Sequence, residues 1–363
     1  MMQQSKTINR GVKNMHIRQF LTGSAAGLAL AVFGAGASVQ AEDIVLRYSN
    51  WVPATHPIIT RVIEPWGQEL SEATEGRVSV EVMPALGPPP GHFDLVANEV
   101  ADLAFSVHGY TPGRFVLTQL GELPLTHNHA VVNSLAYWNT YERYFMDANE
   151  HEGTRLLGLW TNGPYQLTMN GDLLTSMDAV EGKRIRVPGP VVEQVTTTLG
   201  MVPISSSVTD AYEQISRGVI DGMFQQLETV YNFNLTEYLT HVSIIPGGFA
   251  HSSQYVVMSE AAYERLSDAD KAALDALSGE ALVRRFAEMW QSEEEEAIGK
   301  LEEGGTVFYD LPPELQEEVG EALAFIRDEW VEAANQRGVD GEAALAFYES
   351  EIERIAAELG VEN

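Results

Sequence analysis

The stretch "KRIRVPGPVVEQVTTTLGMVPISSS" runs from Lys183 to Ser207 and contains the pattern that decides the fold. Residues 183–188 alternate in polarity and end at a proline, which predicts a short strand. Residues 190–200 carry apolar side chains at helical spacing and end at a glycine, which predicts a helix. Residues 201–207 predict a second strand. A strand, a helix and a strand in succession are typical of a parallel α/β sheet.

The same alternation continues on both sides of this stretch. From Ser259 onward the chain is instead mostly helical and strongly acidic, with Ser267 placed as a helix cap. No low-complexity linker divides the chain, although 363 residues exceed one hydrophobic core. We therefore expect two α/β lobes between which the chain crosses more than once. The other expected strands include residues 77–84, 101–110, 154–163, 164–170, 219–226 and 306–312, and the other expected helices include 59–76, 92–100 and 208–218.

The N-terminus differs in composition from the rest of the chain. Four basic residues and no acidic residue precede Glu42, and an apolar run over residues 20–37 ends in the small-residue sequence "SVQA" at Ala41. This order is typical of a secretory signal peptide over residues 1–41. A membrane anchor is the alternative, but the run is short and rich in glycine for a span. We expect an exported protein located in a bacterial periplasm.

The composition excludes several kinds of function. The chain has no cysteine, which excludes disulfides, a thiolate nucleophile and a cysteine-based zinc site. Its net charge is −30, and loss of the four basic residues of the signal peptide would make it −34. Such a surface repels nucleic acid and anionic lipid. Because only three lysines follow residue 41, we also hypothesise that the surface is adapted to a saline habitat.

Three basic residues gather at the start of the opening stretch, in an otherwise acidic chain. On a strand, Arg184 and Arg186 share one face, and Lys183 points to the other. Arg186 lies next to the carboxyl end of the strand, where ligands bind in open α/β sheets. A guanidinium there can hold a carboxylate through two parallel hydrogen bonds. From the residues alone, a surface arginine paired with an acid remains an open alternative.

Several segments resemble one family, the solute-binding proteins of TRAP (tripartite ATP-independent periplasmic) transporters. The segments "AVEGKRIRVPGP", "LGMVPISSS" and "AYEQISRGVIDG" resemble motifs that follow one another in that family. The earlier segments "YSNWVPATHP", "GRVSVEVMPALG" and "EVADLAFSVHGYTPGRFVLTQLGELPL" resemble its first strands and loops. The resemblance covers nearly the whole mature chain, in the right order.

The resemblance implies a fold and a division of the chain. It implies a periplasmic-binding-protein-like α/β fold, in which two lobes are joined by crossing strands and long C-terminal helices and close on a ligand in the cleft between them. We expect lobe I to comprise residues 42–164 with about 250–290, and lobe II residues 165–249 with about 291–363.

The resemblance also implies a receptor and not an enzyme. Such a protein captures an organic acid anion by hinge closure and delivers it to a membrane permease with a small and a large subunit. No cofactor takes part, and the receptor is expected to be a monomer. Arg186 matches the family's arginine that binds the ligand carboxylate, and Asn50 matches an asparagine that lines the cleft in some members.

Two departures from the family pattern bear on the ligand. The family's D-G-Q-E-N run is "DGMFQQ" here, so Phe224 and Gln225 stand where Glu and Asn would, and Gln225 keeps a side-chain amide. A second arginine, found upstream in sugar-acid-binding relatives, has no counterpart in "NGPYQLTMN", which contains Tyr165 and Gln166. One arginine with aromatic neighbours predicts a monocarboxylate that has an apolar or aromatic body. The other candidates for the site are Trp51, His108 and Tyr110.

Other functions and sites stay open on the residues alone. A secreted α/β enzyme acting on carboxylic acids would need a nucleophile or an acid–base pair, and the sequence shows no motif for either. A binding protein that feeds a sensor would use the same fold. His127 and His129 could belong to a metal site, but a turn before a helix explains them as well, and we expect no metal. The run "SEEEE", residues 292–296, predicts a solvated helix face.

Overall fold

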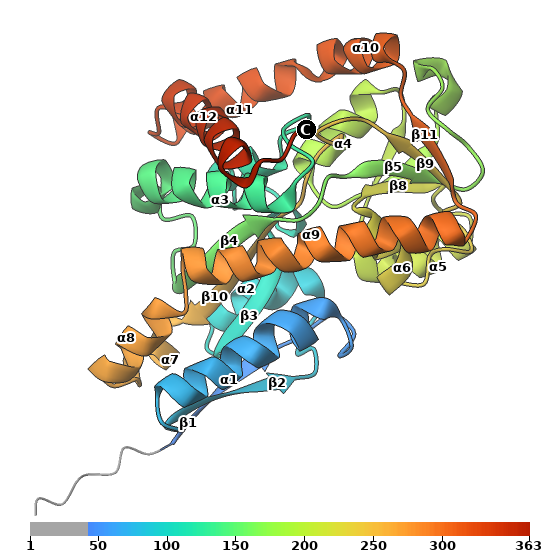
Figure 1. Cartoon of the computed structure of the whole chain (residues 1–363). Helices are drawn as coiled ribbons and strands as arrows, with labels where there is room; N and C mark the ends of the chain where they lie inside the picture. Colours follow the sequence, from blue (N-terminus) through green and yellow to red (C-terminus); the bar gives the residue numbers. More distant parts are fainter. Residues whose placement is uncertain (1–42) are drawn as a thin grey trace, which may run out of the picture. The chain divides into compact units, whose positions relative to one another are not determined.

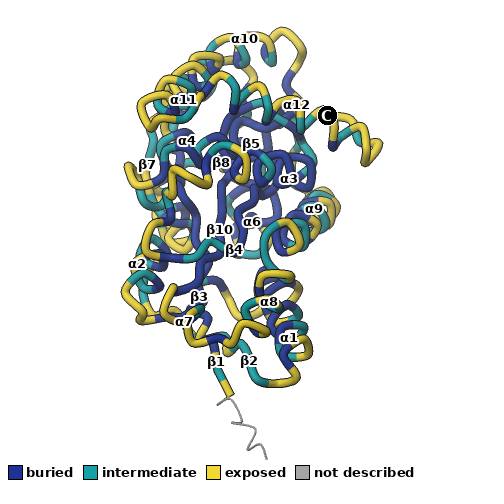
Figure 2. The backbone as a smooth tube through the Cα atoms, turned by 90° about the vertical axis from the view of Figure 1, so that its left-hand side faces the viewer, coloured by how far each residue is buried: buried dark blue, intermediate teal, exposed yellow. Residues whose placement is uncertain are grey.

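The computed structural model describes residues 43–363, and the signal peptide expected over residues 1–41 lies outside them. Two β-sheets form the centre of this part of the chain, and helices with exposed outer faces surround them (Figures 1 and 2). The strands are β1 (Ile44–Ser49), β2 (Val78–Met83), β3 (Leu103–Val107), β4 (Thr154–Thr161), β5 (Gln166–Met169), β6 (Arg184–Val187), β7 (Val202–Ser205), β8 (Gly222–Gln225), β9 (His241–Ile244), β10 (Ser253–Ser259) and β11 (Val307–Asp310). The α-helices are α1 (Glu64–Ala73), α2 (His92–Ala97), α3 (Ala130–Thr140), α4 (Pro190–Thr198), α5 (Ala211–Ser216), α6 (Leu227–Asn232), α7 (Glu260–Glu264), α8 (Asp268–Ala276), α9 (Glu280–Glu303), α10 (Pro313–Leu323), α11 (Phe325–Gln336) and α12 (Gly341–Leu359).

The first sheet has the strand order β2-β1-β3-β10-β4. Strand β1 pairs in parallel with β2 and β3, and β10 pairs antiparallel with β3 and β4. Strand β10 lies far along the chain from its two neighbours, so the chain leaves this sheet after β4 and returns to it with β10. The expected crossing between two α/β layers is therefore observed.

The second sheet has the strand order β11-β9-β5-β8-β6-β7. Strand β6 pairs in parallel with β7 and β8, and helices α4 and α5 connect these three strands along the chain. The strand, helix and strand predicted over residues 183–207 are therefore confirmed. Strand β5 is antiparallel to both β8 and β9.

The two faces of the second sheet are set by the alternation of side chains along its strands. On β8, Met223 packs in an apolar cluster with side chains of α5, α6 and α9, whereas Phe224 points to the other side and contacts Phe249. Arg186 is in register with Met223 on the neighbouring strand. Because paired residues share a face, Arg186, Met223 and Gln225 point to the same side of the sheet.

Helix α9 is long and passes both sheets (Figure 1). Near its start, Phe286 stacks on Trp160 of β4 with the ring centroids 3.6 Å apart. Further along, Ala297 and Leu301 join the apolar cluster on one face of the second sheet. No helix among residues 43–363 has both the length and the apolar character that crossing a bilayer requires.

The last helices do not all lie with the second sheet, where we expected residues 291–363. Helix α10 contacts α4, but α12 packs against α3 and α11 and buries Ala344, Tyr348 and Ile355. The apolar face of an amphipathic helix is buried wherever a complementary surface lies, which the sequence of the helix does not specify. We propose that the two lobes are best divided by their sheets, with α9 common to both.

The acidic run over residues 292–296 is only partly solvated. Glu294 is buried and accepts hydrogen bonds from the backbone N–H groups of Leu227 and Glu228, at 3.0 and 3.1 Å. Burial raises the pKa of Glu294 to about 8. The expectation of a solvated face is therefore wrong for Glu294, because α9 passes the N-terminus of α6 at this position and the carboxyl group satisfies its free N–H groups.

Candidate ligand-binding site

A pocket lies where strand ends of the two sheets meet. Trp51 follows β1, Tyr110 follows β3, Asn162 follows β4, and Arg186 and Gln225 lie at the ends of β6 and β8. The site is therefore formed at the carboxyl ends of strands, where α/β sheets bind ligands. The aromatic residues in its wall are Trp51, Phe105, Tyr110, Tyr165, Phe233 and Trp290.

Arg186 is a fully buried side chain in the wall of this cavity, with only 1% of its surface exposed. Its Nε donates to the carbonyl of Ser206 at 2.9 Å, and Nη2 donates to the hydroxyl of Tyr110 at 3.2 Å. These two bonds fix the plane of the guanidinium. A guanidinium held in this way points its remaining N–H groups in a fixed direction.

The other two basic residues of the same segment have acidic partners. Lys183 lies 2.5 Å from Asp172, and Arg184 lies 2.6 Å from Asp221. Within residues 43–363 no ion pair is found for Arg186. A buried charge that has only neutral partners is unfavourable. The alternative of a surface arginine paired with an acid therefore describes Arg184, and Arg186 is available for an anion.

Tyr110 joins the two sheets at this arginine. It follows β3 of the first sheet, and its hydroxyl oxygen accepts from Arg186 and from the backbone N–H of Val208, at 3.2 and 3.0 Å. The adjacent backbones touch, because a Cβ atom added to Gly189 would lie 2.6 Å from the Cα of Gly109. Only glycine on both sides allows this approach between the segments that follow β3 and β6.

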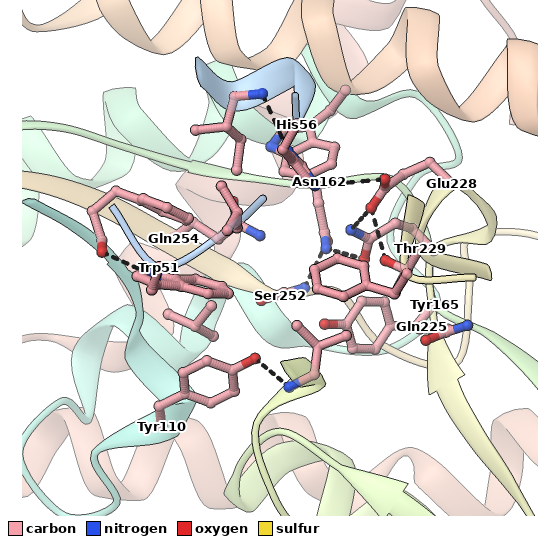
Figure 3. A pocket seen from close by; sticks show the side chains of 18 of the residues that line it. Trp51, His56, Tyr110, Asn162, Tyr165, Gln225, Glu228, Thr229, Ser252 and Gln254 are labelled. Carbon is pink, nitrogen blue, oxygen red and sulfur yellow. Dashed lines mark hydrogen bonds and ion pairs between the residues drawn. The ribbon is translucent and has the colours of Figure 1, made fainter. Parts of the chain in front are cut away.

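Gln225 is buried in the cavity wall, and neither atom of its amide has a hydrogen-bond partner among the described residues. An unpaired buried donor and acceptor cost free energy, so a polar group of a ligand is favoured beside them. Tyr165 lies close to Gln225 in Figure 3. Burial raises the pKa of Tyr165 to about 12, so its phenol is neutral and can donate.

A second group of polar side chains surrounds Glu228, which is also buried in the wall. Oε1 accepts from Gln226 and from Thr229, both at 2.7 Å, and Oε2 accepts from Asn232 at 2.6 Å. Asn162 donates in turn to Gln226. Burial raises the pKa of Glu228, while the three hydrogen bonds oppose that rise. An acidic network of this kind is unexpected in a site that also presents an unpaired arginine.

The structure places five of the nine candidate residues in the cavity wall: Arg186, Gln225, Trp51, Tyr165 and Tyr110. The other four have different surroundings. The side chain of Asn50 bonds to the backbone of Val52 and shapes the loop after β1. Gln166 bonds to both backbone groups of Ile245, and Phe224 points to the opposite face of the sheet.

His108 also lies away from the wall, in a buried aromatic cluster. Its Nδ1 is 2.7 Å from the Ser253 hydroxyl, and its Nε2 is 2.9 Å from Nε2 of His151. Burial lowers the pKa of His108 well below its ordinary value. Its polar atoms are thus bonded within the protein.

Several residues in the wall were not predicted from the sequence. Asn162 and Gln226 each follow a strand directly, and this position is the signal that would have found them. His56 and Glu228 carry no such signal.

His127 and His129 bond to each other through Nδ1 of His127 and the backbone N–H of His129, at 2.9 Å. In the part of the chain that the structure describes, no group of three or more His, Asp or Glu side chains is arranged to hold a metal ion.

Comparisons with known proteins identify a family and several similar proteins. Residues 48–333 match a family model described as bacterial extracellular solute-binding protein, family 7. A TRAP periplasmic solute-binding protein from Bordetella bronchiseptica, solved with bound (R)- and (S)-mandelate, is 34% identical, with a TM-score of 0.84 and coverage of 86% of this chain and 99% of that chain.

Two further relatives are similar over most of their length. A marine metagenome TRAP solute-binding protein, described as specific for aromatic acid ligands and solved with metahydroxyphenylacetate, is 26% identical, with a TM-score of 0.80 and coverage of 86% of this chain and 99% of that chain. A protein of Comamonas testosteroni, described as the outer membrane transporter protein TsaT, is 26% identical over 317 residues, which cover 86% of this chain and 93% of that protein.

Proposed function

The chain belongs to the bacterial extracellular solute-binding proteins of family 7, the solute-binding proteins of TRAP transporters, and on that premise we propose that it captures an aromatic monocarboxylate. The observation that carries the proposal is the buried guanidinium of Arg186, which has only neutral partners among the described residues. A ligand carboxylate supplies the missing negative charge, in a cavity where little water competes.

The wall of the cavity supports an aromatic body for the ligand. Six aromatic side chains line it, and Trp51 stacks on Phe105 with the ring centroids 4.6 Å apart. Such surfaces bind planar apolar groups by area and by ring stacking. Among the lining residues Arg186 is the one Lys or Arg, and Glu228 is an acid. This charge pattern favours one carboxylate and disfavours two.

The relatives support the same class of ligand. The Bordetella bronchiseptica protein was solved with mandelate and the marine protein with metahydroxyphenylacetate, and both molecules are aromatic monocarboxylates. We propose that this chain acts in the periplasm after cleavage of residues 1–41. Closure of the two lobes would bring Tyr110 to Arg186 and bury the ligand, and the closed receptor would deliver it to the small and large permease subunits.

A ligand panel tests the proposal. The chain from Glu42 onward is titrated calorimetrically with mandelate, phenylacetate, benzoate and their hydroxylated derivatives, and with succinate and sialic acid for comparison. We expect binding of aromatic monocarboxylates and none of succinate or sialic acid. In parallel melts, a ligand present at about one hundred times its Kd should stabilise the protein by about 2.7 kcal/mol. Tighter binding of succinate than of any aromatic acid would refute the proposal.

A further inference from the structure

His56 and Glu228 face each other across a gap in the cavity wall. His56 Nε2 lies 4.0 Å from Glu228 Oε2, and the two side chains are 2% and 1% exposed. This distance is too long for a hydrogen bond. Both residues line the cavity that contains Arg186. Two polar atoms of complementary character thus lie about 1 Å beyond hydrogen-bond distance, close enough for one oxygen atom beside them to bond to both.

The donor on one side of the gap is defined by the bonds of His56. Its Nδ1 accepts from the backbone N–H of Ile58 at 3.2 Å. Burial lowers the pKa of His56 to about 4, so the imidazole is neutral at neutral pH. A neutral imidazole that accepts at Nδ1 carries its proton on Nε2. The N–H group therefore lies on the side of the ring that faces Glu228.

The acceptor on the other side is Glu228 Oε2. This oxygen accepts one hydrogen bond, from Asn232, whereas Oε1 accepts two. A carboxylate oxygen has two acceptor positions, so one position on Oε2 remains. The aromatic rings of Phe233 and Trp290 flank His56, with ring centroids 5.9 and 6.0 Å from the imidazole. The gap therefore adjoins the part of the wall that suits an aromatic ring.

We infer that this gap binds a hydroxyl group of the ligand, which accepts from His56 Nε2 and donates to Glu228 Oε2. If a hydroxyl oxygen lay about 2.8 Å from both atoms, the angle His56 Nε2–oxygen–Glu228 Oε2 would be about 90°. This angle suits one donated and one accepted hydrogen bond. The inference rests on the proposed function. It narrows the ligand to a hydroxylated aromatic monocarboxylate, with the carboxylate on Arg186 and the hydroxyl between His56 and Glu228.

The chemistry of the gap excludes other substituents. A second carboxylate would be repelled by Glu228, and an ammonium group has no lone pair for the N–H of His56. A hydrogen or methyl group would leave the N–H of His56 without an acceptor in a buried place. A site that hydrogen-bonds a hydroxyl group discriminates strongly against the analogue that lacks it, for the same reason.

Matched ligand pairs test the inference on the unaltered protein. Benzoate and phenylacetate are each compared with their 2-, 3- and 4-hydroxy derivatives by titration calorimetry. We expect at least one hydroxylated isomer to bind about tenfold or more tightly than its parent acid. If every isomer binds no tighter than its parent, only water occupies the gap and the inference is overturned, while the proposed function stands. If no aromatic acid binds, both are overturned.

Two variants assign the effect to the gap. Glu228→Gln changes the acceptor, and His56→Phe keeps a ring between Phe233 and Trp290 but removes the donor. We expect the ratio of the two affinities, hydroxylated to parent, to fall to near one in both. Glu237→Gln, on the exposed surface, should keep the wild-type ratio. A ratio that survives in both cavity variants would overturn the inference, whatever the individual affinities become.

Discussion

The hydroxyl of Tyr110 lies 3.2 Å from Nη2 of Arg186, although the two residues come from different sheets. The same oxygen accepts a hydrogen bond from the backbone N–H of Val208, which follows β7 of the second sheet. One phenol thus orients the arginine of the site and links the segment after β3 to strand β6 and to the segment after β7. Capture of an anion and closure of the two lobes are therefore expected to depend on each other.

Replacement of Arg186 should abolish ligand binding. Arg186→Gln removes the charge on which the carboxylate depends, and we expect the affinity for aromatic acids to fall at least about a hundredfold, about 3 kcal/mol. Arg184→Gln is the matched control, because Arg184 is two residues away on the same strand and is paired with Asp221. Titration calorimetry measures both. Equal affinities of Arg186→Gln and the wild type would contradict the role.

Tyr110→Phe should weaken binding without abolishing it. The change leaves the aromatic ring but removes the oxygen that accepts from Arg186 and Val208, which costs about 1–3 kcal/mol, or roughly fivefold to 150-fold in affinity. Tyr231→Phe, whose side chain is exposed, should bind like the wild type. The same dissociation constant for Tyr110→Phe and the wild type would show that Tyr110 only packs against the site.

Gly189→Ala should hold the two lobes apart. The added methyl would lie 2.6 Å from the Cα and 2.9 Å from the carbonyl oxygen of Gly109, and backbone atoms cannot yield as flexible side chains do. We expect ligand affinity to fall about tenfold or more, and small-angle scattering with ligand to show a larger radius of gyration than the wild type. The control is Gly299→Ala in α9, where the methyl meets nothing within 4 Å. A wild-type radius of gyration for Gly189→Ala would contradict the prediction.

Glu294 should make the protein less stable as the pH rises toward 8. Burial raises its pKa from 4.5 to about 8, so between these values the folded state keeps a proton that the unfolded state has lost. The stabilisation is complete below pH 4.5, decreases as the pH rises, and is lost above pH 8; it amounts to at most about 5 kcal/mol.

Glu294→Gln, which stays neutral, should remove most of this dependence. Urea unfolding at pH 5, 6.5 and 8 measures the slope of the free energy of unfolding. Glu295→Gln, exposed on the same helix, should keep the slope of the wild type. The neighbouring carboxyl group of Glu228 contributes in the same direction, since its pKa is also raised by burial. A slope that is unchanged in Glu294→Gln would show that Glu294 is ionised in the folded state.

Salt should raise the melting temperature. The net charge of −30 causes self-repulsion in the folded state, which counterions screen. We expect the melting temperature to rise steadily from low to molar NaCl, in agreement with a surface adapted to a saline habitat. A melting temperature that stays constant over this range would refute that hypothesis.

Much of the fold could be predicted because its signals are local. The strand at Arg184–Val187, the helix at Pro190–Thr198 and the strand at Val202–Ser205 follow from periodicity and from proline and glycine positions. The Ser267 cap of α8 follows from residue type, and its hydroxyl does accept from the N–H of Asp270. The packing partners of the last helices could not be predicted, because the apolar face of a helix shows that it is buried but not which surface buries it.

The candidate site likewise contains features that the sequence could predict and features that it could not. Arg186 and Gln225 could be predicted because each lies at the end of its strand. Side chains alternate along β8, so Phe224 points away from the cavity that Gln225 faces. The role of Gln166 could not be predicted, because both atoms of its amide bond to Ile245, which lies 79 residues away in the sequence. The residue type alone therefore does not show whether a polar side chain near a site contacts the ligand or holds a loop in place.

By itself the sequence determined many of the strands and helices, the acidic charge, and the strand end at which Arg186 stands, since each depends on residues close together in the chain. Only the tertiary structure decided that Tyr110 would meet Arg186, that Glu294 would be buried at the start of α6, and that His56 would face Glu228 across 4.0 Å. These relationships join segments that are distant in sequence. Their distances follow from the packing of the two sheets and of α9, which is set by the whole core and not by any one motif.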